Sequence, residues 1–440
     1  MARKSYDAIP LFEGYSPLPS SEIKETKLTD CQNIICRKGQ TFVRPGYEQV
    51  ATALSGEIMG LHSYHRLRHD EQRLVAFTQN DMVEYTTISG ETSWSPVDIT
   101  LAGGPRDFVS TVQVVNNETR DQELVFTNGY DPVYYYDGSS VDTVFSTESD
   151  PDGISAKYVA YYNNHMFMGY IYDAGQQYPQ SVWVSDYADP YNFTYGEGSV
   201  TYTDLIDHVD YITGLRLLRG HLLIYREGNI SICTATGNND SPFEVTEGAI
   251  HQGTPAGRTI CDVDGVFHIF LGSDMNVYVT DGVNLDPVGN DVQKDILLNI
   301  NRATMDRSHA VIFRDYELYL LFIPTGSSDY PDKCYCYNYR EQHWTFWKLA
   351  HKITASCIHR FPVYDVPTWG AYDDGVKLSP EFDGRRWNDP IPTGEETVIL
   401  GDERGKIYKM DLQAITDAGS PIEAFLETKD YEYDGVTAIR

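Results

Sequence analysis

The chain has 440 residues, of which 41% are hydrophobic and 13% aromatic, so it can bury one large core or two or three smaller ones. This composition excludes an intrinsically disordered chain. The 64 acidic residues outnumber the 34 basic residues and give a formal net charge of −30, which excludes a general surface that grips a phosphate backbone. With 35 glycines, 33 tyrosines and many short apolar runs, the sequence favours an all-β fold with frequent turns.

The cysteines and the first residues indicate the compartment. Seven cysteines are an odd number in a long chain, which fits reduced thiols better than a disulfide framework. The first 20 residues have no apolar core long enough for a secretory signal, and no later stretch approaches the ~18 apolar residues of a membrane span. We therefore expect synthesis in a bacterial-type cytoplasm, with the protein kept there or in a particle assembled there.

The chain begins with an arm and a hairpin. Residues 1–30 are polar and punctuated by prolines, so we expect an extended arm, which either docks on a neighbouring subunit or is disordered. "NIICRKGQTFVRPGYEQV" then predicts two strands separated by Arg37, Lys38 and Gly39. In Arg44-Pro45-Gly46-Tyr47, proline fixes φ and glycine permits a positive φ, so these residues predict a type II-like turn that leads into a strand before the first repeat.

A hairpin pattern then recurs along the chain. Seven segments consist of an apolar strand, a polar turn and a second strand with alternating large side chains, and they begin at Leu74, Leu124, His165, His221, Val266, Glu317 and Thr397. Most starts are about 40 to 60 residues apart, the period of four-stranded propeller blades. Further strands are expected in "KYVAYYNN" and "AVIFRD". The prediction is a β-propeller over residues 31–440 with about seven blades, although six or eight blades are also compatible with the pattern. It carries a proline-rich insertion at 360–395.

One short helix interrupts the pattern in "NDVQKDILLNINRAT". Val292, Ile296 and Ile300 recur at helical spacing, and Asn290 or Asp291 can cap the N-terminus. We interpret this helix as a decoration of the propeller.

The tyrosine cluster of "DPVYYYDGSSVDTVF", from Asp131 to Phe145, has two interpretations. Tyr134–Tyr136 could stack on sugars, or they could fill the space between blades. Packing is favoured, because similar large side chains recur in the repeated strands at Trp183, Tyr278, Tyr335, Tyr337 and Tyr408. The corner at Asp137 and Gly138 is then equivalent to the corner at Asp281 and Gly282.

The sequence contains only weak signals for metal-binding or catalytic residues. His62, His65 and His69 lie close in sequence, but no helix gives them a zinc-site spacing, so surface histidines are expected. Cys334 and Cys336 lack a matching pair of ligands and are expected in the core. Asp150 and Asp152 resemble a calcium loop without its downstream glutamate, so a turn is favoured. Because there is also no catalytic fingerprint, we expect no catalytic residue, cofactor or metal; among the many carboxylates, nothing singles out a glycosidase pair.

Four stretches together resemble one family. Arg44-Pro45-Gly46-Tyr47 after "NIICRKGQTF" resembles the N-terminal element of the tail nozzle, or packaged-DNA stabilisation, proteins of short-tailed bacteriophages, which are β-propeller tail tubular proteins. Asp210–Gly237, with Gly214 and Gly237, is similar to a hairpin of that family. His251–Ile300, with Gly282, is similar to its turn, hairpin and short helix, and Phe313–Leu349, with Trp344, to its tryptophan-bearing strand. Their order along the chain carries the resemblance.

The resemblance implies a structural virion protein of the tail, without enzymatic activity. Family members form a homo-oligomeric ring, generally a hexamer, below the portal and the head-to-tail adaptor. The ring extends the DNA channel, retains the packaged genome, guides DNA ejection and contacts tail spikes, fibres or a plug. Viral double-stranded DNA passes without sequence-specific binding, and the charge of −30 would discourage adhesion within a Debye length of about 8 to 10 Å.

Family members can continue for several more strands where this chain ends at Arg440, which leaves the blade count and the plug open. Two other functions also remain open. One is a carbohydrate-binding or glycan-cleaving propeller used in host attachment, and the other is an intracellular scaffold for other proteins.

Overall fold

The computed structural model describes residues 11–19, 22–66, 71–88, 91–117, 119–145, 153–238, 241–362, 393–433 and 436–438. His69, Asp150, Asp152 and residues 363–392 of the predicted insertion lie outside these described residues.

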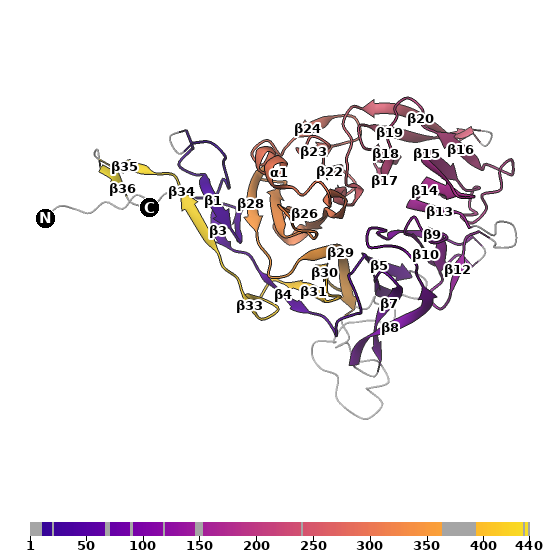
Figure 1. Cartoon of the computed structure of the whole chain (residues 1–440), viewed down its shortest axis with the longest axis horizontal. Coiled ribbons are helices and arrows are strands. Elements are labelled where there is room, and N and C mark those ends of the chain that lie inside the picture. Colours follow the sequence, from indigo (N-terminus) through magenta and orange to yellow (C-terminus); the bar gives the residue numbers. More distant parts are fainter. Residues whose placement is uncertain are drawn as a thin grey trace, which may run out of the picture.

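The chain forms an all-β propeller of seven blades, which confirms the predicted fold class (Figure 1). Each of the first six blades is an antiparallel sheet of four consecutive strands. Their bounds are β5(Gly60–Arg66), β6(Glu71–Phe77), β7(Asp81–Ile88) and β8(Glu91–Thr100); β9(Ser110–Val115), β10(Gln122–Thr127), β11(Tyr134–Tyr136) and β12(Val141–Thr143); β13(Ser155–Tyr162), β14(His165–Asp173), β15(Gln176–Val184) and β16(Thr201–Asp204); β17(Ile212–Leu218), β18(His221–Arg226), β19(Ile230–Asn238) and β20(Ser241–Ile250); β21(Cys261–Val263), β22(Phe267–Leu271), β23(Val277–Thr280) and β24(Leu285–Pro287); β25(His309–Phe313), β26(Leu318–Ile323), β27(Lys333–Asn338) and β28(His343–Trp347).

The seventh blade joins the two ends of the chain. Its strands are β29(Ile353–Pro362), β30(Thr393–Asp402), β31(Ile407–Asp411) and, from the beginning of the chain, β4(Gly46–Gln49). β4 pairs antiparallel with β31, so the fourth strand of the last blade precedes the first blade in sequence; β32 and β33 extend the same sheet beyond β4. This arrangement closes the ring of blades and leaves few free strand edges.

All seven predicted hairpins are the second and third strands of a blade. The two further predicted strands are β13 and β25, the innermost strands of blades 3 and 6. The middle strands are covered on both faces by neighbouring blades, and all six residues of β26 are buried. A strand that is buried on both faces has a continuous apolar run in its sequence. This explains why these strands were the easiest to predict.

The hydrophobic core lies between adjacent blades. Between blades 2 and 3, Val114 and Val125 pack in one cluster with Met168 and Ile171. Each side chain of this kind contributes about 1.5 to 3 kcal/mol when it leaves water. Because every blade packs against both neighbours, closing the ring buries the faces of the first and last blades as well.

Tyr134–Tyr136 form β11 and pack between blades, as predicted. Tyr134 stacks on Phe126 with ring centroids 5.5 Å apart, and Tyr135 stacks on Tyr191 at 4.5 Å. Tyr136 is buried, and its hydroxyl donates to Glu84 of blade 1 over 3.0 Å. The cluster therefore stabilises the contacts of blade 2 with both of its neighbours.

The corners at Asp137 and Asp281 have the same geometry. The Asp137 carboxylate accepts the backbone N–H groups of Ser139 and Ser140, and Asp281 accepts those of Val283 and Asn284. Gly138 and Gly282 follow with φ values of 95° and 90°. Only glycine adopts such values without strain, so the two corners are equivalent turns between the third and fourth strands of blades 2 and 5.

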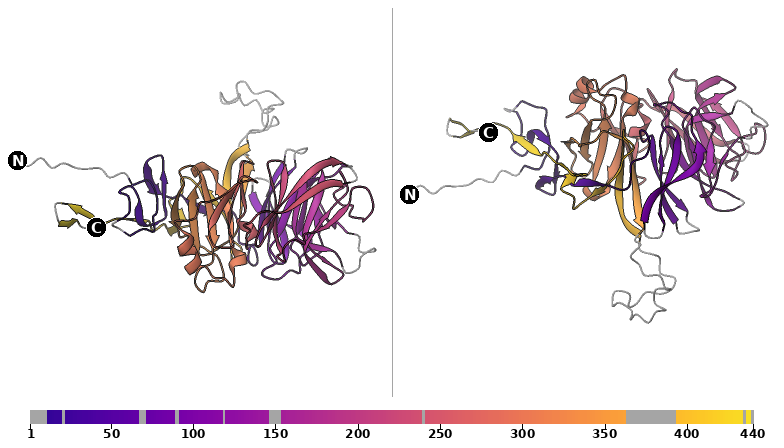
Figure 2. Two further views of the ribbon diagram at one scale, coloured as in Figure 1. Left: turned by 90° about the horizontal axis from the view of Figure 1, so that it is seen from above. Right: turned by 60° about the horizontal axis from the view of Figure 1, so that its bottom comes forward.

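Both ends of the chain project from one side of the propeller (Figures 1 and 2). We call the described residues of 11–43 and 412–438 the flange. Its strands are β1(Leu28–Gln32), β2(Ile34–Arg37), β3(Gln40–Val43), β32(Thr416–Asp417), β33(Ser420–Pro421), β34(Phe425–Thr428), β35(Tyr431–Tyr433) and β36(Val436–Ala438). β1 pairs with β34, and β2 pairs with β3 in the predicted hairpin.

The described part of the N-terminal arm packs on its own chain. The Tyr15 N–H donates to the carbonyl of Trp344, and the Trp347 indole donates to the carbonyl of Ile34. Both tryptophans lie on β28, the outermost strand of blade 6. The arm therefore covers an edge that would otherwise be open.

The predicted helix is α1(Gln293–Asn299), and three short 3-10 helices are η1(Gly257–Thr259), η2(Met305–Arg307) and η3(Arg314–Tyr316). The predicted cap of α1 is wrong, because Val292 occupies the N-cap position without a side-chain hydrogen bond. Asn290 instead accepts from Asn276, and Asp291 pairs with Lys27 of the flange. In the described part of the chain, no helix has the length and apolar character needed to span a bilayer.

Candidate functional site

The four residues of the Arg44–Tyr47 motif lie where the two ends of the chain meet. Tyr47 pairs with Met410 across β4 and β31, and its ring packs edge-on against Tyr408 at 5.0 Å. Burial raises the pKa of the Tyr47 hydroxyl, which stays protonated and contacts His351 Nδ1 over 2.9 Å. The motif is therefore part of the closing strand of blade 7.

The predicted type II-like turn at this motif is wrong. Residues 44 and 45 connect β3 directly to β4, and Gly46 is the first residue of β4, without a positive φ. A Cβ atom at Gly46 would lie 2.0 Å from the backbone oxygen of Thr416. Glycine is required here because another backbone segment approaches it closely, a reason that no local pattern reveals.

Arg44 joins three segments of the chain from a fully buried position. Its guanidinium forms a bidentate ion pair with Asp417, with N–O distances of 2.6 and 2.8 Å. The remaining N–H groups donate to Asn33 Oδ1 and to the carbonyls of Pro45 and Lys348. All five guanidinium donors thus have partners, which is what a buried arginine needs to offset its desolvation.

The other motif residues are spread over the propeller. Gly214 lies in β17, where a Cβ atom would meet the Ile260 side chain at 2.9 Å. Gly237 has a φ of 74° near the end of β19, and Gly282 forms the corner described above. Trp344 is buried in β28, stacks near Tyr337 and donates to the carbonyl of Val288. These residues serve separate turns and contacts, and the structure does not bring them together.

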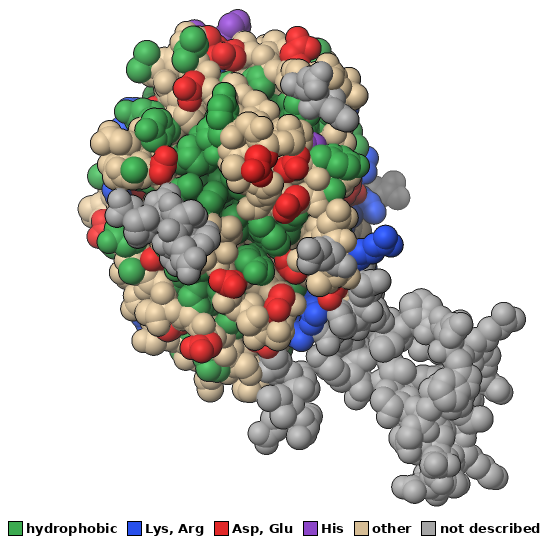
Figure 3. Space-filling model, turned by 90° about the vertical axis from the view of Figure 1, so that its right-hand side faces the viewer, with side chains coloured by type: hydrophobic (Ala, Val, Ile, Leu, Met, Phe, Trp, Pro, Cys, Tyr) green, Lys and Arg blue, Asp and Glu red, His purple; other side chains and the backbone are tan. Residues whose placement is uncertain are grey.

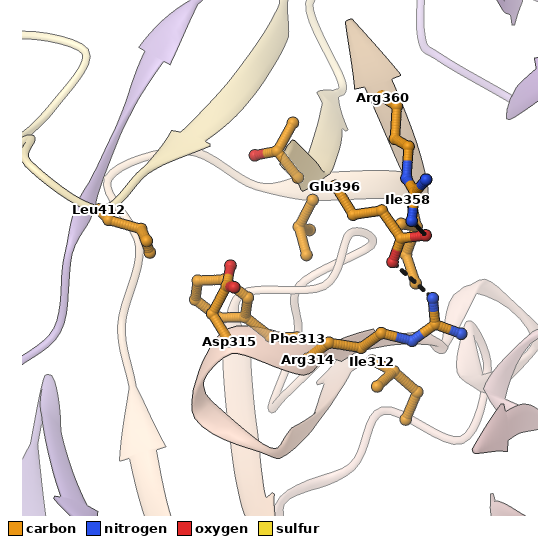
Figure 4. Close-up of a pocket in the computed structure, with 10 residues that line it drawn as sticks. Ile312, Phe313, Arg314, Asp315, Ile358, Arg360, Glu396 and Leu412 are labelled. Carbon is orange, nitrogen blue, oxygen red and sulfur yellow. Dashed lines mark hydrogen bonds and ion pairs between the residues drawn. The ribbon is translucent and has the colours of Figure 1, made fainter. Parts of the chain in front are cut away.

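A pocket of about 400 Å³ opens between blades 6 and 7 (Figure 4). Glu396 bridges Arg314 and Arg360 along one wall, with distances of 2.5 and 2.7 Å. Apolar side chains line the rest of it, and Asp315 points into the space between them. The two arginines hold the pKa of the Glu396 carboxyl below its usual range against the opposing effect of burial. The Glu396 carboxylate is therefore held in its charged form by two ion pairs.

Arginines cross the axis of the propeller at one mouth of its tunnel. Arg258, which precedes blade 5, lies over the Phe108 ring at 4.1 Å and donates to the carbonyl of Thr354 in blade 7 over 2.5 Å. Arg307, which precedes blade 6, pairs with Glu57 and donates to the carbonyl of Pro105. Contacts between such distant blades span the axis, so these side chains obstruct the tunnel of the propeller.

Of the metal candidates considered from sequence, His62, His65, Cys334 and Cys336 lie in the described part of the chain and form no metal site there. In the chain as described, no three His, Cys, Asp or Glu side chains are placed to hold a metal ion. His62 is half-buried, not the exposed histidine that was expected, and its Nδ1 contacts Thr111. Burial lowers its pKa to about 4. Cys334 and Cys336 are fully buried, as predicted, with their sulfur atoms 3.8 Å apart and unbonded.

Charge is distributed unevenly around the propeller. Residues 121–215, which form most of blades 2 and 3, contain 15 acidic residues and one basic residue, Lys157. Figure 3 shows this side, where apolar and acidic side chains alternate and Lys and Arg lie near the edge. The flange presents a different surface, with exposed apolar side chains at Leu18, Val43, Leu412, Ile415, Phe425 and Leu426.

Two features of this site were not identified from the sequence. The partner of Arg44, Asp417, lies in a polar stretch without a recognisable pattern. A strand was expected after this motif, but its pairing with β31 was missed because that partner is more than 350 residues away. One signal was present, since the seventh predicted hairpin at Thr397 had no fourth strand after it and a propeller needs one.

The comparisons with known proteins concern the fold. No protein-family model matches the chain, and no curated protein matches it in sequence. Among solved structures, the chain is similar to PorZ, an essential bacterial surface component of the type-IX secretion system of Porphyromonas gingivalis, with 10% identity and a TM-score of 0.43. The similarity covers 88% of this chain and 40% of PorZ, so the chain spans less than half the length of that protein.

A second similar structure is BBS1N from its crystal structure in complex with ARL6DN. Identity is 9% and the TM-score 0.46, over 84% of this chain and 99% of that one. Likeness at this level concerns the propeller fold and carries nothing about function.

Proposed function

We propose that this chain is the ring-forming subunit of the tail nozzle of a short-tailed bacteriophage. The ring would extend the DNA channel, retain the packaged genome and guide its ejection. Its partners would be further copies of the chain in a homo-oligomeric ring, the head-to-tail adaptor, and tail spikes, fibres or a plug.

The observation that carries the proposal is the flange. Both chain ends leave the propeller on one side, pair with each other through β1 and β34, and present exposed apolar side chains such as Phe425 and Leu426. A projection on one side of a rigid subunit supports head-to-tail association, and such a contact closes into a ring when the rotation between copies allows it. Six copies, as the family resemblance implies, would make this ring a hexamer.

The stretches that resemble the nozzle family occupy distinct parts of the fold in the same order. The Arg44–Tyr47 motif is in the closing strand, and Asp210–Gly237 covers most of blade 4. His251–Ile300 covers blade 5 with α1, and Phe313–Leu349 covers most of blade 6. The resemblance therefore extends over whole structural units, which supports a shared architecture.

The proposed mechanism breaks no covalent bond. Closure of the seven blades would make each subunit rigid, and the DNA channel would lie between subunits, because Arg258 and Arg307 obstruct the tunnel of the propeller itself. The net charge of −30 would repel the phosphate backbone within a Debye length of about 8 to 10 Å, so DNA would move without adhering.

Assembly tests the proposal directly. We expect the purified chain to form a closed ring in mass photometry and cryo-electron microscopy, and the same ring to lie at the tail end of the parent particle. The double substitution Phe425→Ser with Leu426→Ser should shift the ring towards monomers. Val283→Ser is the matched control, because Val283 is 81% exposed in a turn of blade 5, away from the flange. A tail end built from another protein would refute the proposal.

A glycan array and a hydrolysis assay separate this function from a carbohydrate-binding or glycan-cleaving propeller. The nozzle requires neither tight sugar binding nor turnover, so either result would favour that alternative. Genes for a portal and an adaptor beside the gene for this chain would favour the nozzle over an intracellular scaffold.

A further inference from the structure

A bulge in the middle strands of blade 3 holds a tyrosine in a strained conformation. The pairing of β14 with β15 shifts between Gly169 and Ile171, and Tyr170 between them has a φ of 59°. The left-handed region costs a residue with a bulky side chain roughly 1 kcal/mol or more. Bulges are often found beside functional sites, where they redirect a side chain out of the regular sheet pattern.

The redirected ring belongs to a small group of tyrosines that we call the tyrosine platform, Tyr170, Tyr172 and Tyr211. Tyr172 stacks on Tyr170 with centroids 5.5 Å apart, and Tyr211 packs edge-on against Tyr170 at 6.0 Å. Tyr211 lies in the connection from blade 3 to blade 4 and is half exposed. In the same connection as Tyr211, the apolar side chains of Ile206 and Val209 are 79% and 97% exposed.

One cation already occupies the platform. The Lys157 ammonium lies over the Tyr170 ring, 4.1 Å from its centroid. Lys157 is the single basic residue of the 95 residues from 121 to 215, and among the described residues it has no ion pair. In a segment with 15 carboxylates, the ammonium therefore contacts an aromatic face, which is the geometry of a cation–π interaction.

Negative charge borders the platform. The backbone N–H of Glu227 donates to the carbonyl of Tyr211, which places this exposed glutamate beside the platform. Burial, and then the like charge of Asp210, raise the pKa of the Glu227 carboxyl. A partner that brings positive charge to this position would relieve that repulsion.

We propose that the tyrosine platform binds a lysine- or arginine-bearing segment of a protein partner, and that Lys157 occupies the place of the partner's cation in the free chain. Tyrosine faces attract cations, the apolar surface of Ile206 and Val209 provides contact area, and the acidic surroundings select against an acidic partner. This surface is in blade 3, separate from the flange.

The test compares two substitutions that remove the same charge. Lys157→Met frees the Tyr170 ring, whereas Lys24→Met removes an exposed ammonium from the flange. Binding of a fluorescein-labelled octalysine peptide to the whole chain is measured by fluorescence anisotropy at 150 mM salt. We expect Lys157→Met to tighten binding at least threefold more than Lys24→Met does. Equal changes in the two variants would overturn the proposal, because general electrostatic attraction would then explain binding.

A second pair of variants tests the rings themselves. Tyr211→Leu keeps an apolar side chain but removes the aromatic face, and Tyr195→Leu does the same at an exposed tyrosine outside the platform. We expect octalysine binding to weaken about fivefold in Tyr211→Leu and less than twofold in Tyr195→Leu, with thermal unfolding confirming that both variants fold. Unchanged binding in Tyr211→Leu would refute the platform, and so would maltohexaose binding that Tyr211→Leu abolishes, since the platform would then be a sugar site.

Discussion

Arg44 and Asp417 are 373 residues apart in the sequence, yet their side chains form a bidentate ion pair with distances of 2.6 and 2.8 Å. Both side chains are almost completely buried. The pair connects the segment before blade 1 to the segment after blade 7, and the Ala350 N–H also donates to Asp417. It therefore fastens the flange to the closed propeller.

We predict that Arg44→Met lowers the free energy of unfolding by about 3 to 5 kcal/mol, because it leaves the Asp417 carboxylate buried without its partner. Urea denaturation measures the loss. The double variant Arg44→Met with Asp417→Leu should recover part of it, since no unpaired charge then remains. Arg37→Met is the control, because the Arg37–Glu317 pair is partly exposed and should cost less than about 1 kcal/mol. Equal losses at Arg44 and Arg37 would contradict the role given to Arg44.

Gly46→Ala should displace the segment that carries Thr416, because the new Cβ atom would lie 2.0 Å from a backbone oxygen. We expect a cost of about 2 kcal/mol or more, and faster hydrogen exchange in residues 416–421. Gly104→Ala provides the comparison, since its Cβ atom would meet only the Asp107 carboxylate, at 3.2 Å. Normal exchange at 416–421 in Gly46→Ala would mean that the contact is not required.

Tyr136→Ala should lower the free energy of unfolding by about 3 to 5 kcal/mol, because a large buried side chain leaves a cavity between blades 1 and 2. Tyr130→Ala, at a tyrosine that is 64% exposed, should change it by less than about 0.5 kcal/mol. Thermal unfolding measured on both variants distinguishes interblade packing from a surface role. A small effect at Tyr136 would revive the interpretation of this cluster as a binding platform.

Stability should fall as the pH is lowered from about 6.5 towards 4. Burial lowers the pKa of His268 and of His359 to about 4, and the neighbouring His62 contributes to the shift at His359. A histidine in the unfolded chain has a pKa of about 6.5. In this pH window the unfolded chain therefore binds more protons than the folded chain, which lowers the free energy of unfolding as the pH falls. Each group contributes on the order of 3 kcal/mol, lost as the pH falls through the window.

Urea denaturation between pH 7 and pH 4.5 measures this dependence. His359→Gln should make the profile less steep, whereas His251→Gln, at an exposed position, serves as the control. A profile that is equally steep in the His359 variant would show that other groups dominate acid unfolding.

The fold could be predicted from the sequence because its repeated unit has a local pattern. The second and third strands of each blade are apolar on both faces and joined by a short turn, as in the hairpin around Leu124. Outer strands such as β12 are short and partly exposed, so their composition resembles that of a loop. The corner of Asp137 and Gly138 was recognisable for the same local reason, since its hydrogen bonds stay within four residues.

The candidate site could be predicted only in part, because long-range contacts determine it. The motif of Arg44 to Tyr47 was recognised as a unit, but Gly46 and Tyr47, which were expected in a turn, begin the strand that pairs with Ile407–Asp411. Val292 precedes α1 although Asn290 and Asp291 are better capping residues, because contacts with Asn276 and Lys27 engage their side chains. In each case a distant partner outweighed the local preference.

The shared seventh blade also has a consequence for biosynthesis. The residues of β4 leave the ribosome before any complete blade exists, while their partner β31 follows more than 350 residues later. At a synthesis rate of ~5 to 20 residues per second, β4 waits tens of seconds for this partner. During that interval six blades can stack, but the ring of blades stays open and the apolar face of Tyr47 stays uncovered. Closure of the ring of blades therefore waits until the chain has been translated through β31.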